Sequence, residues 1–277
     1  MIIDSHQHFW KYNPIRDSWI DGSMEILKKD FLPYDLAPIL KDNYVDGCIA
    51  VQADQSEEET KFLLKCAKEN PFIKGVVGWV DLQADNVQER LAYFSKDILF
   101  KGVRHIIQAE SDEYFMLRPS FQNGISKLEK FDLTYDVLIH QNQLPGLVEL
   151  VKRFPNQRFV LDHMAKPSVS EELNAAWVHN IQNLAKHKNV YCKLSGIITE
   201  AKNYAWEREK IIPFIDIVVN AFGTNRLMYG SDWPVCLLAA QYGKVMDVFT
   251  DYFIGYKKGQ LNKVMGNNAA KFYRIKQ

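Results

Sequence analysis

Short runs of β-branched and other apolar residues recur along the chain, and each is followed by a segment whose apolar residues are spaced three and four apart. The first pattern is typical of buried strands and the second of amphipathic helices. Residues 57–69 and 147–154 are examples of the second, with charges opposite an apolar face. The eight expected strands cover residues 2–8, 47–53, 73–80, 102–108, 133–140, 158–163, 190–195 and 227–232.

This alternation of strand and helix predicts a parallel sheet with right-handed crossovers. Eight such units in about 250 residues are typical of a (β/α)8 TIM barrel, so we expect an α/β fold with one domain spanning residues 1–277. A doubly wound sheet is the alternative, but the first strand leads into DSHQHFW, which lacks the glycine-rich turn of a nucleotide site. The irregular residues 9–30 are expected to fold over one end of the barrel.

Composition and charge narrow the classes of protein to consider. The hydrophobic content of 47% is ordinary for a globular protein and excludes intrinsic disorder. Because 34 basic residues balance 34 acidic residues, charge gives no reason to expect a nucleic acid or an anionic membrane as a partner. Four dispersed cysteines and the absence of a signal-like start favour a soluble protein of the reducing cytoplasm, and the sequence is compatible with a homo-oligomer.

Polar residues gather at the carboxyl ends of the expected strands, where barrel enzymes place their active sites. Histidine is uncommon, yet four of the seven histidines close strands. The residues at or near strand ends are His6, His8, Arg104, His105, His140, Asp162, His163, Lys193, Ser195 and Asp232.

His6 and His8 alternate on the first strand, so both imidazoles point to the same side, toward the barrel axis. They can hold one metal ion or one substrate oxygen. His140 from the fifth strand and Asp232 from the eighth would complete a set of three nitrogens and one oxygen of the kind that zinc accepts. An H-x-H pair alone is a weak motif, and the coincident strand ends are what favour a functional site.

Several longer segments resemble the amidohydrolase superfamily, in particular its amidohydrolase-related lactonases and their L-fuconolactonase-like branch. The segments are IDSHQHFW (3–10), GVVGWVDL (75–82), KGVRH (101–105), FVLDHMAKP (159–167), VYCKLSG (190–196), RLMYGSDWPV (226–235) and NNAAKFY (267–273). The resemblance implies a distorted (β/α)8 barrel that hydrolyses a cyclic ester.

The resemblance also bears on the expected cofactor, one divalent metal ion with zinc as the first choice. Members with one metal use a set that maps onto His6, His8, His140 and Asp232 of this chain. The lactonase branch often lacks the fifth-strand histidine and works without added metal, so a metal-free site stays the alternative. A binuclear site is disfavoured because the fourth strand has no lysine or glutamate at a bridging position.

Individual residues receive the following expected roles. Asp232 is the general base that takes a proton from water, and His163 hydrogen-bonds the carbonyl oxygen or the water. Asp162 is either functional or part of a core network. Arg104 and Lys193 bind substrate or else pair with a buried carboxylate, and Trp79 and Trp233 form an apolar wall for a sugar ring. We expect Lys166 to be solvated and His105 to face the helices.

The expected function is hydrolysis of a small sugar-acid lactone in carbohydrate catabolism. One rival is a metal-dependent decarboxylase of the same superfamily, whose carboxylate-bearing substrate would need several arginines at the site. The other is a sugar-binding barrel that has lost catalysis. Fold alone does not separate the three.

Overall fold

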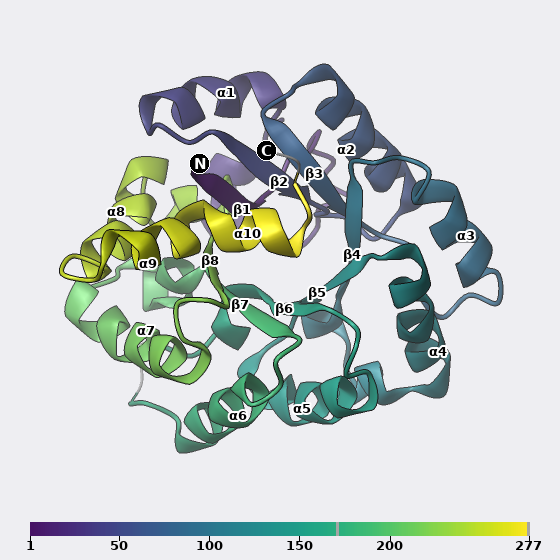
Figure 1. Ribbon diagram of the computed structural model, residues 1–277. Helices are drawn as coiled ribbons and strands as arrows, with labels where there is room; N and C mark the ends of the chain where they lie inside the picture. Colours follow the sequence, from purple (N-terminus) through teal and green to yellow (C-terminus); the bar gives the residue numbers. More distant parts are fainter. Residues whose placement is uncertain (170–171, 276–277) are drawn as a thin grey trace.

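The structure is a computed structural model, and it describes residues 1–169 and 172–275. Eight parallel strands pair in chain order, which confirms the predicted barrel and every predicted strand (Figure 1). The strands are β1 (Ile3–Gln7), β2 (Gly47–Val51), β3 (Ile73–Gly78), β4 (Phe100–Ile106), β5 (Thr134–Leu138), β6 (Phe159–Leu161), β7 (Val190–Leu194) and β8 (Leu227–Tyr229).

The first and last strands close the barrel just beyond their carboxyl ends. Gln7 forms an isolated parallel bridge with Trp233. The His8 N–H donates to the Trp233 carbonyl at 2.7 Å, and the Asp232 N–H donates to the His6 carbonyl at 2.8 Å. This closure brings the ends of β1 and β8, and their polar residues, together.

Helices surround the barrel, and their apolar faces pack on the outside of the strands (Figure 1). The helix predicted at residues 57–69 is α2, with Ser56 as its N-cap, whose side chain accepts from the Glu59 N–H. The helices are α1 (Pro33–Asp42), α2 (Glu57–Glu69), α3 (Val87–Phe94), α4 (Pro119–Leu128), α5 (Leu144–Arg153), α6 (Ala175–Ala185), α7 (Arg208–Phe222), α8 (Tyr242–Tyr252), α9 (Lys258–Asn262) and α10 (Asn268–Phe272).

The two ends of the barrel are covered differently. At the amino end of the strands, α10 and Tyr273 pack against inward-facing residues of the barrel such as Ile49 and Val160. At the carboxyl end lie residues 9–30, a segment that contains a short 3-10 helix (Gly22–Leu27) and in which Trp10 is buried and pairs with Phe31. This segment covers that end of the barrel, as predicted. Among the described helices, none has both the length and the apolar character needed to cross a membrane.

Candidate active site

A cavity of about 430 Å³ opens at the carboxyl end of the strands, and this volume is in the range of small-molecule sites. Its wall is apolar on the side of residues 9–30 and polar where the strands end. The lining residues are His8, Trp10, Trp19, Met24, Ala53, Arg104, Ile106, Gln108, Ala109, Leu138, His163, Lys166, Thr199, Glu200, Tyr204, Asp232, Val235 and Leu238.

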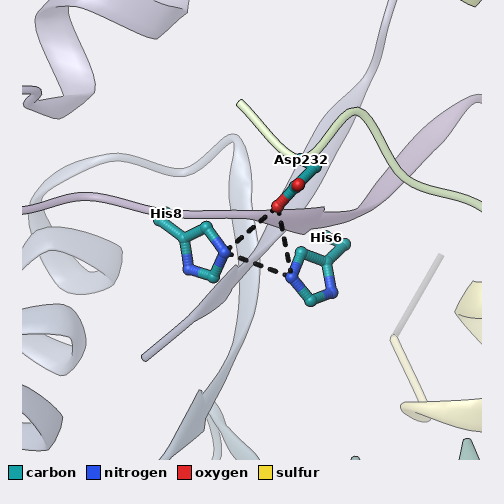
Figure 2. A group of neighbouring side chains, drawn as sticks. All are labelled: His6, His8 and Asp232. Carbon is teal, nitrogen blue, oxygen red and sulfur yellow. Dashed lines mark hydrogen bonds and ion pairs between the residues drawn. The ribbon is translucent and has the colours of Figure 1, made fainter. Parts of the chain in front are cut away.

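His8 lines this cavity, and His6 lies next to it on the same strand, fully buried. Both rings are buried, and their Nε2 atoms approach each other at 3.2 Å (Figure 2). His8 Nδ1 lies 2.8 Å from the Val51 carbonyl oxygen, which accepts a hydrogen bond only from a protonated Nδ1. In the neutral ring, Nδ1 carries that proton and Nε2 offers a lone pair to a ligand.

The carboxylate of Asp232 completes this group. Its Oδ1 atom lies 3.4 Å from His8 Nε2 and 3.7 Å from His6 Nε2, as Figure 2 shows. Burial raises the pKa of Asp232, but the neighbouring His163 ring, the hydrogen bond with His8 and the His6 ring outweigh burial and hold that pKa below its usual value. Asp232 is thus ionised at neutral pH.

The geometry of these three residues fits a single metal ion. Ligands at about 2.0–2.1 Å from a tetrahedral zinc lie about 3.3 Å from one another, and the three contacts here span 3.2 to 3.7 Å. Arg104 Nη1, which can only donate, lies 3.3 Å from His6 Nε2 and thereby favours a lone pair on that nitrogen as well. Two imidazole nitrogens and one carboxylate oxygen converge as zinc requires.

His163 reaches the same group from the turn after β6. Residues His163, Met164, Ala165 and Lys166 all have positive φ, between 48° and 60°, and the Lys166 N–H donates to the His163 carbonyl at 2.8 Å. This left-handed turn costs about 1–2 kcal/mol for each residue with a side chain. In return it places His163 Nε2 3.8 Å from Asp232 Oδ1.

The ring of His163 is fixed from the β7 side. Its Nδ1 atom lies 2.8 Å from the Ser195 hydroxyl oxygen, and Gly196 packs directly beneath the ring. Burial lowers the pKa of His163 to about 4, against the opposing effect of Asp232. The ring is therefore neutral at neutral pH and can carry a proton on one nitrogen only.

Beneath His6 lies a buried cluster of charges. The fully buried Lys193 ammonium lies 2.6 Å from Asp136 Oδ2 and 3.0 Å from Asp162 Oδ1. Arg104 donates to Asp162 Oδ2 at 3.1 Å. Burial tends to raise the pKa of Asp162, but the charge of Lys193, the hydrogen bond with His6 and the charge of Arg104 hold that pKa well below its usual value. His6 Nδ1 lies 3.4 Å from Asp162 Oδ1, so the cluster supports the ring from below.

The comparisons with known proteins agree with this geometry. A family model described as amidohydrolase matches residues 3–275. The chain belongs to the amidohydrolase family. The match runs through β1, which carries His6 and His8, and through the segment after β8, which carries Asp232.

Two relatives of this amidohydrolase are named L-fucono-1,5-lactonase. The protein of Burkholderia ambifaria is 35% identical, over 99% of this chain and 95% of its own length. The protein of Burkholderia multivorans is 37% identical, over 99% of this chain and 96% of its own length. A crystal structure of an amidohydrolase from Burkholderia multivorans with bound zinc is 37% identical, covers 100% of both chains and superposes with a TM-score of 0.96.

One predicted ligand of this amidohydrolase does not join the site. His140 belongs to neither of the two groups of close metal-ligating atoms found among the described residues, and it is exposed. The reason is that β5 ends at Leu138, so His140 lies beyond the strand, where its N–H donates to Gln143 Oε1 at 3.0 Å. Asp136, an inward-facing polar residue of β5, is bound to Lys193.

Three predicted substrate contacts of this amidohydrolase also lie outside the lining. Lys193 is fully buried and held by Asp136 and Asp162. Of the two tryptophans, Trp79 lies just after β3, where its backbone is bonded to the Thr60 hydroxyl of α2. Trp233 is buried edge-on against two aromatic rings, those of Phe9 and Phe31.

Other predicted placements agree with the structure. Arg104 lines the cavity as well as pairing with Asp162. His105 faces the helices, where its ring stacks on Phe115. Asp162 belongs to the buried network, one of the two alternatives.

Sequence reasoning missed part of the lining. Lys166 was expected to be solvated, but its side chain is only 21% exposed, and its Nζ lies 3.5 Å from Glu200 Oε1. Trp10 and Trp19 supply the aromatic wall that Trp79 and Trp233 were expected to form. The aromatic content of residues 9–30 was a usable signal for this wall, whereas no local pattern marks Glu200.

Proposed function

We propose that this amidohydrolase is a lactonase that opens the cyclic ester of a small sugar-acid lactone resembling L-fuconolactone. The observation that carries the proposal is the Asp232 carboxylate at the floor of the cavity, within 3.4 to 3.8 Å of three imidazole nitrogens. The names of the two Burkholderia relatives support the substrate class. An ester needs a base for water and a donor for the oxyanion, and the cavity offers both.

Asp232 acts as the general base. It accepts a proton from a water molecule as the water oxygen bonds to the lactone carbonyl carbon. The bond from that carbon to the ring oxygen then breaks, and the leaving alkoxide takes up the proton. The product is an open-chain hydroxy acid, which releases a proton to solvent at neutral pH.

His163 and Arg104 stabilise the charge that develops on the carbonyl oxygen. His163 can donate from Nε2 if the Ser195 hydroxyl donates to Nδ1, and the 2.8 Å contact between those atoms allows this tautomer. The Arg104 guanidinium lines the same cavity and is held in place by Asp162 and by two oxygens of Gln52. Donors fixed in this way need little reorganisation during the reaction.

We further propose one divalent metal ion, zinc, held by His6, His8 and Asp232. Such an ion supplies a Lewis acid that polarises the carbonyl and lowers the pKa of water. The spacing of the three ligand atoms supports this set. His140, exposed beyond β5, is left out of it.

The cavity favours a lactone over the substrate of a decarboxylase. Of the described residues that line it, one, Arg104, is an arginine. An aromatic or enoic acid with several carboxylates would call for more cations, whereas a sugar lactone is neutral and presents hydroxyl groups. A binding protein without catalysis would have no need of a buried carboxylate among three histidines.

A proton-release assay tests the proposed function. Five- and six-membered aldonolactones, L-fucono-1,5-lactone among them, are offered with and without a chelator, and the metal content is measured in parallel. We expect turnover of at least one lactone and a loss of about a hundredfold or more in Asp232→Asn. Asp42→Asn, at an exposed position in α1, is the matched control. Activity in protein shown to be free of metal would reject the metal but keep the base.

Two results would overturn the proposal itself. One is the absence of turnover across the whole panel of lactones. The other is near-normal turnover in a folded Asp232→Asn variant, which would remove Asp232 from the reaction.

A further inference from the structure

We infer that Lys166 and Glu200 form a subsite that recognises the hydroxyl groups of the substrate, an inference that rests on the proposed lactonase function. The two residues come from different loops, Lys166 from the turn after β6 and Glu200 from the segment after β7. Both line the cavity that also contains His163 and Asp232.

The two side chains are placed to meet a bound molecule. Lys166 Nζ lies 3.5 Å from Glu200 Oε1, and the side chains are 21% and 22% exposed. An ammonium has three N–H donors and a carboxylate accepts at about four positions, so one ion pair leaves both groups with capacity for a ligand. The partial burial limits competition from water, which makes a hydrogen bond to a charged group stronger.

The backbone that presents Lys166 is unusual. Four successive residues with side chains, His163 to Lys166, adopt the left-handed conformation, which L-residues avoid. The first and last of the four, His163 and Lys166, line the cavity, whereas Met164 and Ala165 are fully buried. Strain of this kind persists where the surrounding structure enforces it, and it concentrates at functional sites. The turn thus places Lys166 and His163 on one short segment beside the cavity.

The chemistry of the pair complements a sugar. A hydroxyl group both donates and accepts, so it can donate to Glu200 while a neighbouring hydroxyl accepts from Lys166. Trp10, Trp19 and Tyr204 line the same cavity and offer apolar surface to the C–H groups of the ring. An unsubstituted lactone lacks the hydroxyl groups that this pair would bind.

An ion pair that merely ties the two loops together makes a different prediction. Its removal would loosen His163 and slow the hydrolysis of every lactone alike. A subsite for hydroxyl groups affects hydroxylated substrates selectively. Comparing two lactones that share a ring and differ in hydroxyl groups therefore separates the two roles.

The experiment compares a six-membered aldonolactone with δ-valerolactone, the same ring without hydroxyls. For Glu200→Gln and Lys166→Met we expect KM for the aldonolactone to rise about tenfold or more, the scale of losing one hydrogen bond to a charged group. We expect kcat for the aldonolactone and kcat/KM for δ-valerolactone to stay close to the wild-type values. The δ-valerolactone measurement also corrects for any effect of the lost charge on the chemistry.

Controls and outcomes are as follows. Glu58→Gln and Lys61→Met remove an exposed ion pair of α2 and should leave the kinetic constants for both lactones unchanged. Circular dichroism checks that each variant is folded. If a single variant unfolds, the double variant Lys166→Met/Glu200→Gln takes its place, because it leaves no unpaired charge. Equal losses on both lactones, or none, would overturn the subsite alone. If wild-type protein opens no lactone, the proposed function falls and this inference falls with it.

Discussion

At Gly196, a single added methyl group should lower both the stability of the protein and the rate of catalysis. It follows β7, has φ of 64° and lies directly against the ring of His163. A Cβ atom at this position would come within 2.5 Å of His163 Nδ1 and 2.7 Å of its Cγ. Non-bonded heavy atoms pack at about 3.5–4.0 Å, so in Gly196→Ala the ring must move by about 1 Å.

Two costs add in Gly196→Ala. An L-residue in the left-handed region costs about 1–2 kcal/mol, and forcing a methyl group into a packed site typically costs a further 1–3 kcal/mol. We therefore expect the free energy of unfolding to fall by about 2–5 kcal/mol. A displacement of about 1 Å at a reacting group can cost about a hundredfold in rate, so kcat for a lactone should fall by that order.

Gly223→Ala is the matched control. Gly223 also has φ of 64°, but no atom of residues 1–169 or 172–275 lies within 4 Å of the Cβ that alanine would add. Its ψ of 160° is even less accessible to L-residues than the −5° of Gly196, so Gly223→Ala carries at least the backbone cost of Gly196→Ala. It should lower stability in urea unfolding and leave kcat unchanged.

The outcome depends on kcat and stability together. Wild-type kcat in a folded Gly196→Ala variant would show that His163 can move without consequence, and His163 would lose its place in the mechanism. A kcat loss of the same size in Gly223→Ala would mean that lowered stability, and not the displaced ring, slows the reaction.

Two further predictions concern buried charges. Lys193→Met leaves Asp136 and Asp162 without their shared cation, so the free energy of unfolding, measured in urea, should fall by about 3–5 kcal/mol. Lys152→Met, which removes an exposed ion pair, is the control. A loss under about 1 kcal/mol in Lys193→Met would contradict the role of the buried network. Burial raises the pKa of Glu59 to about 7, so the stability that its protonated form provides is complete below about pH 4.5 and is lost as the pH rises through 7. The free energy of unfolding of Glu59→Gln should therefore rise by about 2–4 kcal/mol relative to that of the wild type between pH 4.5 and 8. The corresponding difference for the exposed Glu58→Gln should stay constant over this range. A constant difference for Glu59→Gln would refute the raised pKa.

The barrel was predictable because its strands obey a local rule. Short runs of β-branched and other apolar residues mark all eight, and alternation on β1 places His6 and His8 on one side, as the structure has them. The ends of strands were less predictable. β6 and β8 are three residues each, shorter than expected, because the chain then enters left-handed conformations around His163 and at Asp232.

The same limit explains the errors at the site. Positive φ is usually signalled by glycine or asparagine, but the segment DHMAKP contains neither, so the turn that carries Lys166 into the cavity has no local signature. His140 was placed by assuming that β5 continued to residue 140. The strand ends at Leu138, and two residues of irregular chain suffice to leave the ring exposed.

The buried charges connect the two ends of the barrel. Tyr273 follows α10, and its hydroxyl donates to Asp136 Oδ2 at 2.6 Å. Asp136 pairs with Lys193, and Lys193 pairs with Asp162. Asp162 in turn contacts the ring of His6. Buried ion pairs add little net stability over apolar packing, so stability alone does not account for Asp136, Lys193 and Asp162 at this depth. These groups fix the orientation of one another through their hydrogen bonds and ion pairs. The series of contacts ends at the ring of His6. Tyr273, which follows the helix at one end of the barrel, therefore helps to hold the His6 imidazole that lies next to the cavity at the other end.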